Sequence, residues 1–362
     1  MGYNKININT ALPDRPRSRV MIIYTGGTVG MAYNRQGVLS PFNFQHILDH
    51  LPALRSLMLD LTVIAFDDPI DSSNVDPTHW QTIGKIVFEN YNTQDGFVVL
   101  HGTDTMAYTS SALSFMLQGL AKPVIFTGAQ LPISESRSDA RENLITALEI
   151  ASAQENGKPM VPEVCLYFDY ELIRGCRAKK VESMYFDAFQ SENYPPLARA
   201  GVRINYATEA IRTPGTGPLT LHTAFDTNIA LLKLFPGISK SMVSAILHID
   251  GLKAVILETY GAGNAPTAAW FLEMLRHAIA SGILILNISQ CPGGMVIQGK
   301  YETSKTLEAL GVVSGRDMTT EAAVTKLMLL LGEHGVEGTA RLVAQSIAGE
   351  LTQDKPNNTN GH

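Results

Sequence analysis

The feature that most constrains the fold of this chain is a repeated alternation of short apolar runs with longer segments of helical periodicity. The runs have the length and composition of buried strands, and they cover Val20–Tyr24, Leu61–Phe66, Gly96–Leu100, Pro123–Phe126 and Val164–Phe168. Between the second and third runs, Trp80, Ile83 and Val87 fall on one helical face, and Asp76-Pro77 suits a helix start. This alternation predicts an α/β fold with a mostly parallel sheet flanked by helices on both faces.

A polar stretch with Pro and Gly at its centre interrupts the alternation between Gly201 and Asn228. Beyond it the alternation resumes, with expected strands at Ile229–Phe235, Ala254–Glu258 and Ile283–Ile288 and expected helices at Thr267–Ala280 and Thr320–Leu331. We therefore expect a larger N-terminal catalytic domain at residues 20–205, a linker at 206–227, a smaller C-terminal α/β domain at 228–351 and a flexible tail at 352–362.

Charge and composition favour small-molecule chemistry. The 362 residues include 34 acidic and 28 basic ones, for a net charge of −6, and no Lys/Arg-rich block occurs, so we expect neither a nucleic acid nor a membrane as partner. No apolar run approaches the roughly 18 residues of a membrane span, and residues 1–19 lack the apolar core of a secretory signal. The three cysteines are widely spaced without a CxxC, which indicates a reducing compartment. We expect a cytoplasmic protein.

Small and hydroxylated residues follow four of the expected strands. In a parallel sheet these positions meet at one edge, where ligands bind. Each motif alone more often serves as a turn or helix cap, but their joint occurrence favours a site. The four motifs are Thr25-Gly26-Gly27-Thr28, Asp71-Ser72-Ser73, His101-Gly102-Thr103-Asp104-Thr105 and Thr127-Gly128-Ala129-Gln130.

With these motifs the chain resembles the bacterial-type L-asparaginase (asparaginase/glutaminase) family, in which a TGGT motif and an HGTDT motif each supply a catalytic threonine. The resemblance covers nearly the whole chain, and the absence of a signal segment makes the chain look like the cytoplasmic type I branch. Its other counterparts are the stretch from Thr127 to Asn143, Arg174-Gly175-Cys176-Arg177-Ala178-Lys179-Lys180, Tyr260-Gly261-Ala262-Gly263-Asn264-Ala265-Pro266 and the segment from Asn287 to Cys291.

The resemblance implies hydrolysis of L-asparagine to L-aspartate and ammonia, with possible weak glutaminase activity, through an acyl-enzyme formed on Thr28. An aliphatic hydroxyl needs a nearby base and donors for the developing oxyanion, and a desolvated lysine can serve as that base. Thr103, Asp104 and Lys180 form the expected second cluster, in which Asp104 pairs either with Lys180 or, as the resemblance favours, with the substrate's ammonium group. Without the motif, Lys180 would be read as a solvated lysine.

The remaining roles also follow from the resemblance. Substrate-binding residues are Asp71, Ser72 and Ser73, with the serines on the α-carboxylate, and the Ala129 carbonyl orients the amide nitrogen. Neither a metal nor an organic cofactor is expected, and the histidines show no ligand spacing. The resemblance further implies a homo-oligomer, a dimer of dimers.

The chain departs from the family pattern at two places. Val38 stands where many members carry a lid tyrosine, so Tyr33 or, as we favour, Tyr301 would take that role, unless Tyr301 is a packing residue. Lys179 stands where cytoplasmic relatives carry an effector-site threonine. We therefore expect near-hyperbolic kinetics, although the possible effector site keeps Tyr260, Asn264, Asn287 and Cys291.

Other interpretations stay open. A nucleotide-binding or dehydrogenase domain would need GxGxxG or GxxxxGK, which the glycine motif does not supply. The glutaminase/amidase subunit of a tRNA-dependent amidotransferase carries an additional N-terminal domain, whereas about twenty residues precede the first expected strand here. A non-catalytic amino-acid-binding module would have no use for two threonines and a lysine. His101 sits in the HGTDT motif, where we expect it only to brace the strand end, and we expect Cys176 and Cys291 to be buried small residues and not nucleophiles.

Overall fold

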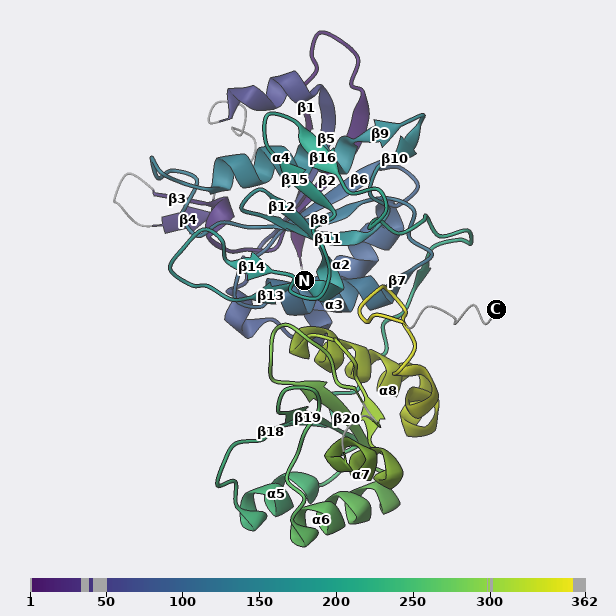
Figure 1. The fold of residues 1–362 in the computed structure, drawn as a ribbon. Coiled ribbons are helices and arrows are strands. Elements are labelled where there is room, and N and C mark those ends of the chain that lie inside the picture. Colours follow the sequence, from purple (N-terminus) through teal and green to yellow (C-terminus); the bar gives the residue numbers. More distant parts are fainter. Residues whose placement is uncertain (1, 34–38, 42–50, 298, 300–301, 354–362) are drawn as a thin grey trace. The chain divides into compact units, whose positions relative to one another are not determined.

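The computed structural model describes residues 2–33, 39–41, 51–297, 299 and 302–353, and the chain divides into two compact units, Met1–His222 and Thr223–His362. Each unit has its own sheet with helices, as Figure 1 shows. The expected α/β class with a larger N-terminal and a smaller C-terminal part is confirmed. No helix in the described part of the chain is both long and apolar enough to cross a membrane.

The first unit is built on a nine-stranded sheet. In order across the sheet, its strands are β1 (Tyr3–Asn9), β5 (Leu59–Phe66), β2 (Ser18–Tyr24), β6 (Gly96–Leu100), β8 (Val124–Thr127), β11 (Val164–Phe168), β12 (Glu171–Arg174), β15 (Ala198–Ala200) and β16 (Ile204–Tyr206). The central strands β5, β2, β6, β8 and β11 are parallel, and the outer strands are antiparallel to their neighbours. The five predicted strands are therefore confirmed as the centre of this sheet.

Helices cover both faces of the central strands. Helix α4 (Ala140–Ser152) packs Leu144 and Leu148 against the face that carries Ile22 and Val98. Phe97 points to the opposite face, where its ring stacks on Tyr91 at the end of α2 (Pro77–Asn90), and α3 (Met106–Met116) lies beside α2. The carboxyl ends of the central strands are thereby fixed relative to one another.

Shorter elements complete the first unit. The 3-10 helices are η1 (Thr28–Gly30), η3 (Pro52–Leu57), η4 (Ser72–Asn74) and η5 (Gly175–Arg177). The short strand pairs are β3 (Met31–Tyr33) with β4 (Leu39–Pro41), β9 (Gln154–Glu155) with β10 (Lys158–Pro159), β13 (Lys179–Lys180) with β14 (Phe189–Gln190), and β7 (Leu117–Gln118) with β17 (Thr220–Leu221).

The second unit contains a parallel sheet of β18 (Ile229–Lys233), β19 (Ala254–Thr259), β20 (Leu284–Ser289) and β21 (Val313–Ser314). Helices α5 (Lys240–Leu247), α6 (Ala269–Ala280) and α7 (Glu302–Leu310) cover one face, and α8 (Thr320–Leu342) covers the other (Figure 1). The strands and helices predicted for this region are confirmed.

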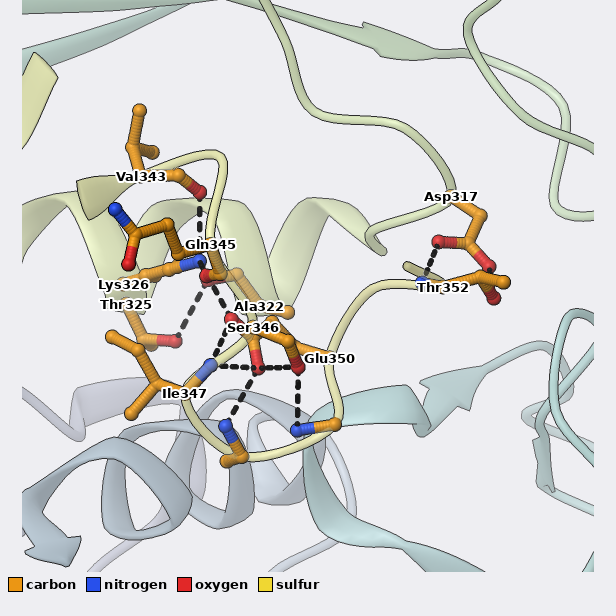
Figure 2. A network of polar contacts seen from close by, with 12 residues as sticks. Asp317, Ala322, Thr325, Lys326, Val343, Gln345, Ser346, Ile347, Glu350 and Thr352 are labelled. Carbon is orange, nitrogen blue, oxygen red and sulfur yellow. Dashed lines mark hydrogen bonds and ion pairs between the residues drawn. The ribbon is translucent and has the colours of Figure 1, made fainter. Parts of the chain in front are cut away.

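A buried ion pair fastens the end of the second unit to α8 (Figure 2). Lys326 on this helix donates from Nζ to the carbonyls of Val343 and Gln345 and to the Glu350 carboxylate, at 2.7, 2.6 and 2.6 Å. Neither charged side chain is exposed, and Glu350 also accepts from the backbone N–H groups of Ile347 and Ala348. The segment after α8 is therefore held by charge-assisted hydrogen bonds as well as by apolar packing.

Candidate active site

The loops that follow the central strands of the first unit are joined to one another through their backbones. Thr25 donates to the Leu100 carbonyl at 3.1 Å and accepts from the Ile70 N–H at 2.8 Å. His101 donates from its N–H to the Thr127 carbonyl at 3.0 Å. All four motifs singled out in the sequence thus lie at one edge of the sheet.

Glycines allow these loops to approach more closely than side chains would permit. A Cβ on Gly26 would lie 2.2 Å from the Ile70 carbonyl oxygen, and one on Gly27 would lie 2.6 Å from the backbone nitrogen of Gly102. A Cβ on Gly102 would lie 2.6 Å from the Ser72 hydroxyl oxygen. Gly26 and Gly27 also have φ values of 142° and 83°, which favour glycine. The glycine requirement therefore comes from both conformation and space.

Each predicted catalytic threonine directly follows one of two glycines, Gly27 and Gly102, whose backbones approach each other closely. Thr28 comes directly after Gly27, begins η1 and is half-buried. Thr103 comes directly after Gly102 and is also half-buried. Backbone contact between the two glycines places the segments that carry both hydroxyls side by side.

Lys180 joins Thr103 and Asp104 from a segment distant in the sequence. Its ammonium group donates to Thr103 Oγ1 at 2.9 Å and to Asp104 Oδ1 at 2.7 Å. The Lys180 side chain is 19% exposed, whereas that of Asp104 is 64% exposed. Strand β13 positions the lysine through its pairing with β14. The structure therefore brings together the hydroxyl, carboxylate and amine that the sequence analysis grouped.

The loop at residues 71–73 is ordered by its own side chains. The Asp71 carboxylate caps η4 by accepting the Ser73 N–H at 3.0 Å. This bond and a second one from the Ser73 hydroxyl lower the Asp71 pKa. Ser72 is buried, and its carbonyl accepts the Thr105 hydroxyl at 2.7 Å. Thr105, to which the sequence assigned no separate role, therefore links this loop to the one that carries Thr103.

His101 braces its strand end, as expected. Its Nδ1 donates to the Gly102 carbonyl at 2.8 Å, so its Nε2 accepts from the Thr109 hydroxyl at 3.0 Å in the neutral ring. Trp80 donates from its indole nitrogen to the same hydroxyl at 3.2 Å. Burial lowers the His101 pKa to about 4, so the ring is neutral near pH 7.

Ala129 is buried between two side chains that the sequence analysis did not assign to the site. Asp139 accepts the N–H groups of Gln130 and Leu131, and Asn143 donates to the Gly128 carbonyl. Neither residue directly follows a strand, so a search for polar residues at strand ends could not find them. The only available signal was their place in the stretch from Thr127 to Asn143.

The possible effector residues lie in the second unit. Tyr260 and Asn264 form an isolated β-bridge, and the buried Asn287 accepts the Thr259 hydroxyl at 2.7 Å.

The structure also tests the other expectations about single residues. Cys176 is buried, as expected. The expectation that Cys291 is buried was wrong, because this residue lies in the exposed segment that follows β20. Tyr301 and Val38 lie outside the described residues, as does the side chain of Tyr33. Within the described part of the chain, no cluster of three or more His, Cys, Asp or Glu side chains could hold a metal ion.

Two family models match the chain: "Asparaginase, N-terminal" over residues 19–212 and "Glutaminase/Asparaginase C-terminal domain" over residues 228–340. L-asparaginase 1 of Escherichia coli (strain K12) is 41% identical, over 93% of this chain and 99% of that protein. The crystal structure of L-asparaginase I from Vibrio cholerae covers 93% of this chain and 100% of its own, with 38% identity and a TM-score of 0.84. The thermostable L-asparaginase from Thermococcus kodakarensis has the same coverage and TM-score with 34% identity.

Proposed function

The chain belongs to the asparaginase family, and from this premise we propose that it hydrolyses L-asparagine to L-aspartate and ammonia with Thr28 as the nucleophile. The contact that carries the mechanistic part of the proposal is the 2.9 Å bond between Lys180 Nζ and Thr103 Oγ1. This contact gives the lysine nitrogen a direct path for exchanging protons with the threonine hydroxyl.

The reaction has two steps. In the first, Thr28 Oγ1 attacks the carboxamide carbon, and its proton passes through Thr103 to Lys180. The C–N bond then breaks, and the nitrogen takes up this proton from Lys180 and leaves as ammonia, which frees the amine to accept a proton again. In the second, water gives a proton to the same pair and attacks the ester, which releases aspartate and returns a proton to Thr28. Weak hydrolysis of glutamine would follow the same course.

Binding of the substrate uses the groups around this pair. The exposed Asp104 carboxylate has a second oxygen, so its bond to Lys180 leaves it able to accept the substrate's ammonium group. Ser72 and Ser73, ordered by Asp71, hold the α-carboxylate. The Ala129 carbonyl accepts an N–H of the amide, and backbone N–H groups after the glycine pair donate to the oxyanion.

The test is ammonia release by the Thr28→Ala variant. We expect at least a thousandfold loss of kcat, because the acyl-enzyme cannot form without the hydroxyl. The matched control is Thr28→Ser, which keeps a hydroxyl and should retain activity. L-asparagine, D-asparagine and L-glutamine are assayed side by side. Near wild-type turnover by the alanine variant would disprove the assignment.

Three further points belong to the proposal. The protein works in the cytoplasm, a view supported by two buried thiols and no disulfide among its three cysteines. It assembles as a dimer of dimers, which light scattering on the purified protein can measure. The last point is that asparagine kinetics are near-hyperbolic, because Lys179 stands where the effector pattern has a threonine.

A further inference from the structure

Ala129 lies between two peptide groups whose orientations are set by the start of helix α4. The Asp139 carboxylate, at the N-cap of this helix, accepts the Gln130 N–H through Oδ2 at 2.9 Å and through Oδ1 at 3.1 Å. Its Oδ1 also accepts the Leu131 N–H at 3.1 Å. The carboxylate therefore fixes the peptide group that contains the Ala129 carbonyl.

The preceding peptide group is fixed from the same helix. The buried Asn143 donates from Nδ2 to the Gly128 carbonyl at 3.0 Å and contacts Asp139 Oδ2 at 3.3 Å. One turn of α4 thus controls the peptide groups on both sides of Ala129.

This control decides where the Ala129 carbonyl points. The bond between Ala129 and Gln130 is a trans peptide, in which the C=O and the N–H point in opposite directions. Since the Gln130 N–H points at Asp139, the Ala129 carbonyl points away from that carboxylate. Rotation of this peptide would break its bonds with Asp139, so the carbonyl direction is locked by a charge-assisted contact.

We propose that Asp139 and Asn143 are positioning residues that aim the Ala129 carbonyl at the carboxamide nitrogen and so favour amides over esters as substrates. This inference rests on the proposed function, in which Ala129 accepts an N–H of the amide. A correctly aimed carbonyl attracts an amide N–H, but an ester offers it only an oxygen lone pair. Disorder of this carbonyl should therefore harm amide hydrolysis and leave ester hydrolysis nearly unchanged.

The experiment compares L-asparagine with the β-methyl ester of L-aspartate, with L-aspartate measured as the common product. In Asp139→Asn, the side-chain oxygen can take the place of Oδ1 and accept both backbone N–H groups. An NH2 group then replaces Oδ2 and presents its own N–H to the donors of Gln130 and Asn143, so one acceptor is lost. We expect kcat/KM for asparagine to fall on the order of tenfold, as for the loss of one hydrogen bond, and kcat/KM for the ester to change less than about threefold. Glu142→Gln is the matched control, because it removes an exposed charge from the same helical turn and should change neither value.

A second variant guards against a failure to fold. A cavity of about 230 Å³ borders Asp139 and Asn143, so water can solvate groups that a substitution leaves without their partner. Asn143→Ser should also lower the ratio of kcat/KM for asparagine to kcat/KM for the ester. If Asp139→Asn does not fold, this second variant tests the inference alone. Parallel losses on both substrates, or no loss on asparagine, would overturn the inference. A wild-type protein that hydrolyses neither compound would overturn the proposed function and this inference with it.

Discussion

Replacement of Lys326 by methionine should destabilise the second unit strongly. Methionine keeps the unbranched apolar stem, so the main loss is the ammonium group and its three hydrogen bonds. Glu350 would stay fully buried with two backbone donors but without its counter-ion. Removal of one partner from a buried pair typically costs about 3–5 kcal/mol, which is a large part of the roughly 5–15 kcal/mol that stabilises a domain.

Urea unfolding followed by circular dichroism measures this loss, with each transition fitted on its own. Hydrogen exchange then locates it, and we expect faster exchange in the residues from Val343 to Glu350. The control is Lys85→Met on α2, whose partner Glu89 lies 3.8 Å away with both side chains at least half exposed. That variant should lose no more than about 0.5 kcal/mol.

The direction of the pH effect follows from the Glu350 pKa. Burial alone would raise this pKa, but the Lys326 ammonium and the backbone donors outweigh it and lower the pKa below its ordinary value. The carboxylate therefore stabilises the fold above the pKa of an unfolded glutamate, and this contribution is lost as pH falls through the lowered value.

The urea experiment can also refute the reasoning. If Lys326→Met lowers the free energy of unfolding by less than about 1 kcal/mol, the buried pair does not act as described, since an uncompensated buried charge must cost more.

Two shorter predictions concern the candidate active site. Gly102→Ala should lower kcat/KM for asparagine at least tenfold in an ammonia assay, because its Cβ would lie 2.6 Å from the Ser72 hydroxyl oxygen. The control is Gly217→Ala, which should behave as wild type because no atom lies within 4 Å of its Cβ. His101 should titrate near pH 4 by NMR, because burial lowers its pKa. Its neutral ring stabilises the fold fully above the ordinary pKa of about 6.5, and stability should fall as pH drops from there towards 4; a midpoint near 6.5 would contradict the buried hydrogen-bonded ring.

The parallel core of the first unit could be predicted because its strands are continuous apolar runs, a signal that local sequence carries by itself. The edge strand β1 could not be predicted in this way. Its residues from Tyr3 to Asn9 are mostly polar and exposed, and its register along β5 comes from backbone pairing. Lys326 was missed for a related reason, because a lysine in an amphipathic helix is normally solvated. Its burial depends on Glu350, a residue 24 positions away.

The sequence by itself determined the α/β class and the strand ends that carry Thr28 and Thr103, because short-range patterns specify strands, turns and glycine positions. Only the tertiary structure decided that Lys180 reaches Thr103 and that Asp139 and Asn143 set the peptide groups around Ala129. Such contacts join residues on different elements, and no local pattern encodes which side chains meet when a helix packs on a sheet. Local motifs thus specify which chemical groups the site contains, whereas the geometry of the site depends on how the elements pack.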